Sequence, residues 1–129
     1  MLTVRRVQLW LPPLLYMALI FYLSAQSNPL PALTTRLWDK GLHTVEYGVL
    51  GLLVCHAVLG EGLTGVKAVL IAVVVASAYG ASDEWHQAYV PLRSSDVRDW
   101  VADTTGSILG AGVLFLQRWL VQKAAEPNH

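Results

Sequence analysis

Apolar residues are gathered into four long runs along the chain, and short polar segments separate these runs. They cover about residues 7–23, 42–59, 65–81 and 100–121. A helix needs about 17–25 mostly apolar residues to cross a bilayer core about 30 Å thick, and each run reaches that length. The pattern therefore predicts an all-α, polytopic membrane protein, a bundle of four transmembrane helices.

The composition changes this picture little. Hydrophobic residues make up 54% of the 129 residues and charged residues only 14%, whereas an ordinary soluble domain has about 25% charged residues. The length suits a single domain over residues 1–129. The formal net charge is zero, which argues against a nucleic-acid partner held by positive charge. The expected partner is the lipid bilayer.

The first run follows Arg5 and Arg6 and could be mistaken for a secretory signal peptide. It is longer than the usual 7–15 residues of a signal core, and residues 23–25 make a poor cleavage site. We therefore expect a retained transmembrane helix. Pro12 and Pro13 are expected in its first turns or at a kink, which neighbouring helices tolerate in lipid.

Short connections make consecutive helices antiparallel, so the segments after the first and third helices must emerge at one membrane face. Five basic residues fall at the opposite face: Arg5, Arg6, Lys67, Arg118 and Lys123. Because cytoplasmic segments carry an excess of Lys and Arg, the sequence predicts a multi-pass cell-membrane protein with both termini in the cytoplasm.

Ionisable residues line one face of the second and third helices near a common membrane surface. Asp39, His43 and Tyr47 are spaced at i, i+4 and i+8, so they share one helix face. On the third helix Asp83 shares a face with three other polar residues, Tyr79, His86 and Gln87. Glu84 is expected to point away from that face, toward a neighbouring helix.

The fourth helix carries one stripe that changes from acidic to small residues. Asp96, Asp99, Asp103, Gly106 and Gly110 recur at spacings of three and four. The glycines predict a close approach of another helix backbone. Ser95 is expected as the N-cap. Carboxylates in the first turn gain from the helix dipole, but that effect does not account for Asp103, which lies one turn deeper.

No familiar catalytic motif is present, and the single cysteine, Cys55, is expected to be a small buried residue. Charges inside a membrane helix cost about 2.5–3.5 kcal/mol each at its centre, so repeated ionisable residues near one face indicate a functional site. Arg93, between acidic helix ends, is expected to pair with Asp99 or Asp103 or to bind an anion.

At these residues the chain resembles the VanZ-like family of bacterial membrane proteins. The second predicted helix carries D-K-x-x-H-x-x-x-Y, and the third carries D-E-x-x-Q with a histidine inside it. P-x-R and D-x-x-x-D-x-x-G follow. In chain order the matching residues are Asp39, Lys40, His43, Tyr47, Asp83, Glu84, His86, Gln87, Pro91, Arg93, Asp99, Asp103 and Gly106.

The resemblance implies a place in the bacterial cell envelope. The founding members are associated with resistance to the glycopeptide antibiotic teicoplanin, but the family's name does not carry resistance over to this chain. A shared fold does not establish a function either.

Three functions remain open, and the first is a membrane-embedded enzyme acting on a lipid-linked or envelope substrate. Its catalytic groups would be His43, Asp83, His86, Asp99 and Asp103. Substrate would be held by Lys40, Tyr47, Gln87 and Arg93, with Asp39 and Glu84 in support. The carboxylates and histidines would supply acid–base chemistry or bind a divalent metal, although nothing in the spacing demands a metal.

The alternatives use the same residues without catalysis. One is an ion- or ligand-binding or transport protein, against which stands the lack of charged residues beyond about two turns into the helices. The other is a structural protein whose polar cluster fixes the bundle. The mixture of histidines, cations and carboxylates exceeds what helix pairing alone requires.

Overall fold

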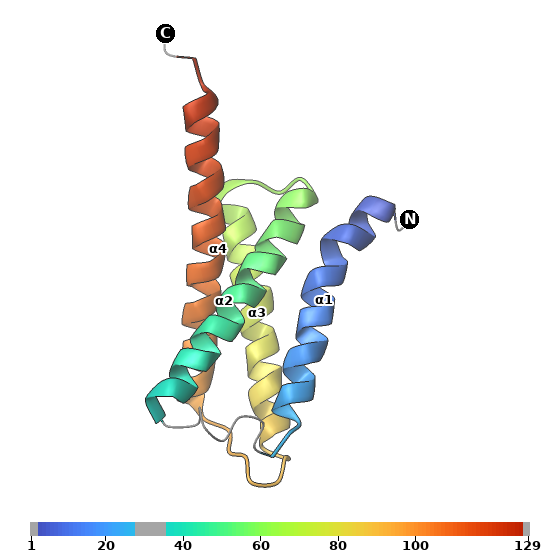
Figure 1. Ribbon diagram of the computed structural model, residues 1–129, viewed down its shortest axis with the longest axis vertical. Coiled ribbons are helices and arrows are strands. Elements are labelled where there is room, and N and C mark those ends of the chain that lie inside the picture. The colour runs from blue at the N-terminus through green and yellow to red at the C-terminus, as the bar shows by residue number, and fades with distance from the viewer. Residues whose placement is uncertain (1–2, 28–35, 128–129) are drawn as a thin grey trace.

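The computed structural model describes residues 3–27 and 36–127, and these fold into four helices without a strand. The helices are α1 (Val4–Ser24), α2 (Arg36–Gly60), α3 (Gly65–Gln87) and α4 (Val97–Ala125). They lie side by side as an elongated bundle (Figure 1). The predicted all-α bundle of four helices is confirmed.

All four helices are longer than the apolar runs that predict them. The second helix begins at Arg36 and the third continues to Gln87, because backbone hydrogen bonding continues through polar residues that hydropathy counts as loop. Helix α4 begins one turn earlier than expected, and its N-cap is Asp96, whose side chain accepts a hydrogen bond from the backbone N–H of Arg98. The expectation of Ser95 as N-cap was wrong by one residue.

Within residues 3–27 and 36–127, three helices are long and apolar enough to cross a membrane: α1, α3 and the part of α2 from Asp39 onward. The fourth has 29 residues but does not join them. Its middle carries hydroxyl residues and glycines, and Gln117 and Arg118 interrupt its apolar end. That α4 also spans the membrane stays a prediction, which its packing along α2 supports.

Glycines bring α2 and α4 into close contact. A Cβ added at Gly106 would overlap the backbone carbonyl oxygen of Thr44, and one added at Gly110 would overlap that of Gly48. Small residues allow this approach in membranes, where helix association depends on van der Waals packing rather than on the exclusion of water. The predicted close approach at these glycines is confirmed.

The apolar core lies nearer the end of the bundle at which α1 begins and α4 ends. Leu50, Val54 and Cys55 of α2 are fully buried there, which agrees with the expected burial of the cysteine. The core face of α3 consists of alanines one turn apart, Ala68, Ala72 and Ala76.

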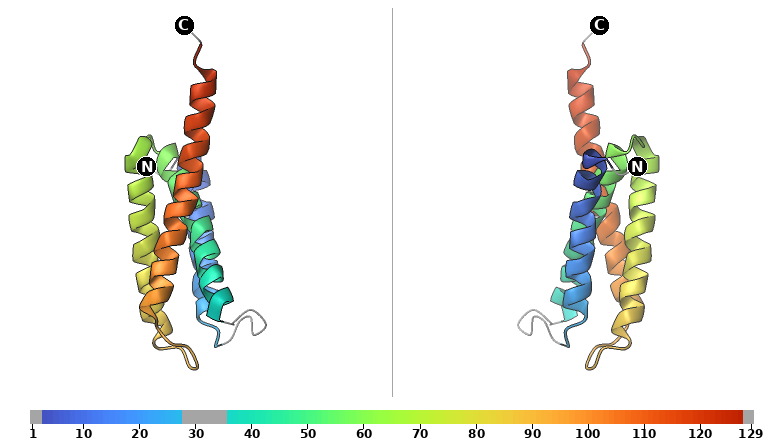
Figure 2. Two further views of the ribbon diagram at one scale, coloured as in Figure 1. Left: turned by 90° about the vertical axis from the view of Figure 1, so that its left-hand side faces the viewer. Right: turned by 90° about the vertical axis from the view of Figure 1, so that its right-hand side faces the viewer.

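Helix α1 begins and α4 ends at one end of the bundle, whereas α1 ends and the segment after α3 lies at the other (Figures 1 and 2). At the terminal end, Arg5 donates to the carbonyl oxygen of Gly60 at 2.8 Å. Arg6 forms an ion pair with Glu61 at 3.0 Å. This arrangement matches the predicted topology. The side of the membrane on which the termini lie stays a prediction.

Candidate functional site

The predicted polar residues of α2, α3 and α4 meet at the end of the bundle away from the termini. We call Asp39, Lys40, His43, Asp83, Glu84, Asp99 and Asp103 the polar cluster. Five of its members are buried: His43, Asp83, Glu84, Asp99 and Asp103. Ionisable groups are seldom buried unless they are paired or functional.

A hydrogen bond between His43 and Asp103 forms the centre of the cluster. Nδ1 of His43 lies 2.7 Å from Oδ1 of Asp103, and Asp103 has no exposed surface. A carboxylate bonded to one ring nitrogen fixes the tautomer and the orientation of the imidazole. The other nitrogen, Nε2, is 3.9 Å from Oδ2 of Asp99. Asp103 therefore holds the His43 ring from behind.

Gly80 of α3 makes room for this pair, although sequence reasoning did not identify it. A Cβ at Gly80 would lie 3.1 Å from Oδ2 of Asp103 and 3.2 Å from Cε1 of Tyr47. Either contact is tighter than packed side chains normally allow. A glycine three residues before Asp83, inside an apolar helix, was the available signal.

Lys40, and not Arg93, is the cationic partner of the acidic residues on α4. Its ammonium group pairs with Asp99 and lies 3.3 Å from Oδ2 of Asp96. Among residues 3–27 and 36–127, Arg93 forms no ion pair. The expected pairing of Arg93 with Asp99 or Asp103 is therefore corrected to Lys40 with Asp99. The reason is geometric, because the first turn of α4 packs directly against the start of α2.

Asp96 belongs to the helix end rather than to the interior. The backbone N–H of Arg98 donates to its carboxylate and, together with nearby Lys40, holds the pKa of Asp96 below its usual range. This is the role that an aspartate at the N-cap of a helix commonly has.

On the α3 side, Asp83 accepts two hydrogen bonds. Tyr47 donates its hydroxyl at 3.4 Å, and Gln87 donates through Nε2 at 3.5 Å. The same amide nitrogen lies 3.0 Å from Oγ of Ser24, which joins α3 to α1. Tyr47 and Gln87, both predicted to hold substrate, thus also bind Asp83.

Glu84 and His86 point in different directions. Oε2 of Glu84 accepts the backbone N–H of Asp96 at 3.0 Å, so Glu84 faces α4 as expected. The ring of His86 stacks on Phe21 of α1 with the centroids 4.6 Å apart. The predicted catalytic role of His86 is still untested.

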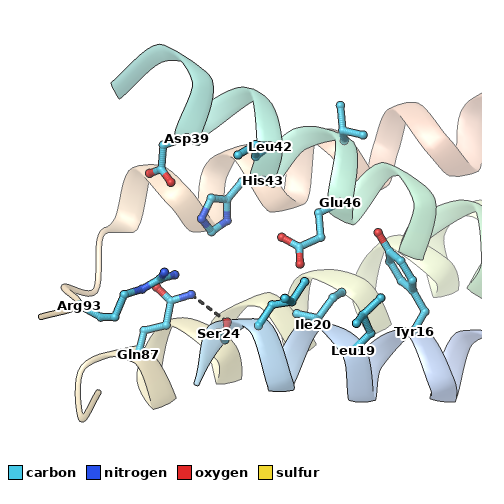
Figure 3. Close-up of a pocket in the computed structure, with 12 residues that line it drawn as sticks. Tyr16, Leu19, Ile20, Ser24, Asp39, Leu42, His43, Glu46, Gln87 and Arg93 are labelled. Carbon is cyan, nitrogen blue, oxygen red and sulfur yellow. Dashed lines mark hydrogen bonds between the residues drawn. The ribbon is translucent and has the colours of Figure 1, made fainter. Parts of the chain in front are cut away.

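Two cavities adjoin the polar cluster. The first, of about 260 Å³, lies between α1 and α2, and its apolar wall includes Leu19, Ile20 and Leu23. The second, of about 380 Å³, is lined mostly by polar residues, among them Ser27 and Ser94. Both are lined by Asp39, His43, Gln87 and Arg93. In Figure 3 the His43 ring points into the first cavity from α2, with Arg93 and Gln87 opposite it.

Glu46 and Tyr16, which sequence reasoning did not assign to the site, line the inner part of the first cavity. Glu46 lies three residues after His43, and this spacing was a signal that it faces the same region.

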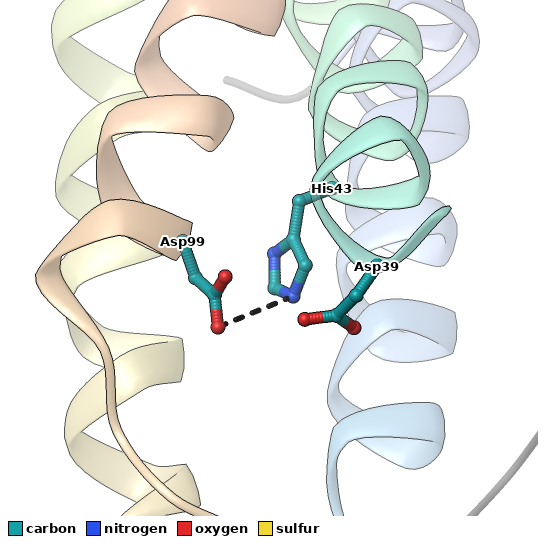
Figure 4. A group of neighbouring side chains, drawn as sticks. All are labelled: Asp39, His43 and Asp99. Atoms are coloured by element: carbon teal, nitrogen blue, oxygen red, sulfur yellow. Dashed lines mark ion pairs between the residues drawn. The ribbon is translucent and has the colours of Figure 1, made fainter. Parts of the chain in front are cut away.

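In the part of the chain that the structure describes, two groups of three side chains present possible metal-ligand atoms within 4.8 Å of one another. One consists of Asp39, His43 and Asp99, and Figure 4 shows the two carboxylates on either side of the His43 ring. The other consists of His43, Glu84 and Asp103, all buried. Carboxylate oxygens with an imidazole nitrogen suit several divalent cations. The use of a metal stays a prediction.

Comparison with known proteins identifies the family of this chain. A family model described as VanZ/LLP1 matches residues 5–119, which include the four helices nearly to their end and the whole polar cluster. No curated protein and no solved structure matches the chain significantly. The family match agrees with the resemblance carried by the motifs on α2, α3 and α4, and the apolar helices make the protein a multi-pass membrane protein. The chain belongs to the VanZ/LLP1 family.

Proposed function

We propose that this protein is a membrane-embedded enzyme of the bacterial cell envelope that acts on a lipid-linked substrate with an anionic head group. One observation carries the proposal. An apolar cavity beside α1 and a polar cavity at the end of the bundle are both lined by Asp39, His43, Gln87 and Arg93. An amphiphile fits that combination, because its two ends need different surroundings.

The first cavity suits part of a hydrocarbon chain. Its walls come from the apolar face of α1 and from Leu42 and Val45 of α2. Val45 is 68% exposed at the outside of the bundle, where a membrane protein meets lipid. A lipid chain can therefore enter sideways from the bilayer without crossing water.

The second cavity suits a charged head group. Arg93 lines both cavities, whereas Lys40 is already paired with Asp96 and Asp99. A guanidinium group offers several donors in a planar arrangement that matches phosphate and carboxylate. We therefore assign the head group to Arg93 and a positioning role to Lys40, which holds Asp99 beside His43.

The chemistry belongs to the region around His43. Its ring lines both cavities, and Asp103 fixes its orientation from the buried side. A histidine held in this way is suited to proton transfer or to binding a metal. Asp99 lies close enough to Nε2 of His43 to assist either process.

The positive-inside rule favours termini in the cytoplasm, since Arg5, Arg6 and Lys67 lie in the first turns of α1 and α3, at the end of the bundle where α1 begins (Figure 1). The polar cluster would then open toward the outer side of the membrane. Substrate would be an outer-leaflet lipid or a lipid-linked precursor of the envelope.

Lipids bound during gentle purification test the proposal. We expect the wild-type protein to retain an anionic lipid, detectable by mass spectrometry of the extract. Arg93→Gln should retain at least fivefold less of it, whereas Arg118→Gln, at the far end of α4, should retain as much as the wild type. Equal retention by both variants would contradict the assignment of the head group.

A second pair of variants tests the chain cavity. Val45→Trp places a large ring at its mouth and should reduce lipid retention, whereas Val49→Trp, one turn along the same helix face, should not. If both variants retain the same amount of lipid, the lipid chain does not bind in this cavity.

A further inference from the structure

Three buried side chains from three different helices converge beside the site. His43 comes from α2, Glu84 from α3 and Asp103 from α4, and one ligand atom of each lies within 4.8 Å of the others. Their exposed fractions are 6%, 5% and 0%. Carboxylates that share a buried space repel each other, so their burial needs a compensating charge.

Two oxygen atoms in this group lack a hydrogen-bond partner. In the described part of the chain, neither Oδ2 of Asp103 nor Oε1 of Glu84 has one. Buried polar atoms are nearly always paired, since an unpaired acceptor loses its hydration without replacement. Oδ2 of Asp103 is directed to the α3 side, where Gly80 leaves room for it. Glu84 lies one turn further along the same helix.

Glu84 is already held in place, because its Oε2 accepts the backbone N–H of Asp96. Partners of this kind orient metal-binding carboxylates and are typical of the shell around a metal site. Nδ1 of His43 and Oδ1 of Asp103 share a proton, and a metal ion bound between them would replace that proton. Nε2 of His43 would then keep its own proton and face Asp99, whose Oδ2 lies 3.9 Å away.

The neighbouring group, Asp39 with His43 and Asp99, is a weaker candidate for the same role. The ammonium group of Lys40 pairs with Asp99 and already supplies a positive charge there. Among the side chains that the structure describes, neither Glu84 nor Asp103 pairs with a lysine or arginine, and the positive charge available beside them is that of a protonated His43. The buried group therefore has less compensating charge than the neighbouring group.

We propose that His43, Glu84 and Asp103 bind one divalent transition-metal ion, with Zn²⁺ or Mn²⁺ preferred to Mg²⁺. An imidazole nitrogen with two carboxylate oxygens favours these metals, whereas Mg²⁺ prefers oxygen ligands and retains water. Ligand atoms about 2.1 Å from a tetrahedral metal lie about 3.4 Å apart. Side-chain rotations must therefore separate His43 from Asp103, which are 2.7 Å apart without the metal, and bring Glu84 closer to both.

The role of the metal in a reaction rests on the proposed function, but the existence of the site does not. The metal would lie beside the polar cavity, where it would polarise a phosphoryl or carbonyl oxygen of the head group held by Arg93. In that role His43 is a ligand, and Asp99 remains as the neighbouring carboxylate. The existence of the metal site can be tested without any substrate.

The test uses full-length protein without a polyhistidine tag, purified in detergent and stripped with a chelator. After incubation with Zn²⁺, Mn²⁺ or Mg²⁺ and desalting, bound metal is measured by mass spectrometry. We expect about one Zn²⁺ or Mn²⁺ per chain. Glu84→Gln and Asp103→Asn should each retain less than a tenth of that amount. Asp39→Asn, which alters only the neighbouring group, should retain the full amount.

Circular dichroism and gel filtration of each variant check that it is folded, so that a loss of metal binding is not caused by unfolding. Cobalt absorption gives a second signal, since a bound Co²⁺ should show visible bands in the wild type and in Asp39→Asn only. Wild-type protein without bound metal, or equal binding by Glu84→Gln, would overturn the site. If the wild type binds no metal but retains lipid in a way that depends on Arg93, the metal site alone is overturned. If it binds the metal but its lipid retention does not depend on Arg93, the proposed function alone is overturned.

Discussion

Nδ1 of His43 and Oδ1 of Asp103 lie 2.7 Å apart across the contact between α2 and α4. The glycine contact of the two helices is immediately adjacent, because Thr44 follows His43 and meets Gly106, which lies three residues after Asp103. The packing that brings these helices together therefore also sets the distance between the two side chains.

The helix contact can be tested with one substitution at two glycines of α4. Gly106→Ala places a Cβ against the carbonyl of Thr44 and should lower stability by about 1–3 kcal/mol, the usual cost of overpacking. Gly112→Ala meets nothing within 4 Å and should be neutral or stabilising by about 0.5–1 kcal/mol. Thermal unfolding in detergent measures both. Equal melting temperatures would argue against the close contact.

Removal of Lys40 should destabilise the bundle more than removal of Arg93. Lys40→Met leaves Asp99 buried without its cation, and we expect a loss of about 1–3 kcal/mol. This is less than the about 3–5 kcal/mol of a fully buried pair, because the Lys40 side chain is 34% exposed. Arg93→Met should change the melting temperature little. A larger loss for Arg93→Met would restore the pairing that the sequence predicted.

The predicted topology can be tested by cysteine labelling from outside intact cells. In a Cys55→Ala background, cysteines at Ser27 and Ser94 should react with an impermeant reagent, and a cysteine at Glu61 should react only after the cells are opened. The reverse pattern would place the polar cluster at the cytoplasmic face. Labelling of Ser27 and Ser94 from opposite sides would contradict the fold.

The sequence predicted the number of helices, their order and the face that carries the site, because each rests on runs of local residues. Apolar length defines each span, and the i, i+4 spacing of Asp39 and His43 defines a face. The glycine stripe also predicted its contact correctly. These features depend on neighbours along one helix.

Features that depend on rotation between helices could not be predicted. Whether Lys40 or Arg93 pairs with Asp99 depends on the distance from α4 to the start of α2, which no spacing encodes. The stacking of His86 on Phe21 depends on where α1 packs against α3. Gly80 becomes important only when Asp103 is placed opposite it.

The central claim is that the polar cluster carries out chemistry on a lipid-linked substrate, and Asp103→Asn tests it most directly. Asparagine has nearly the same shape as aspartate, so packing near Gly106 should survive. The substitution removes the negative charge of Asp103. That charge is needed whether Asp103 supports His43 as a proton acceptor or binds a metal. His43→Ala and Asp83→Asn should likewise lose function, whereas Gly112→Ala should keep it.

The decisive measurement is the profile of lipids and lipid-linked intermediates in cells that lack the gene, compared with cells that carry each variant. We predict that one lipid-linked species accumulates in the deletion strain. The wild type and Gly112→Ala should return it to normal, while Asp103→Asn, present at the same protein level, should leave it accumulated. Full restoration of the profile by normally expressed Asp103→Asn would contradict catalysis at this site.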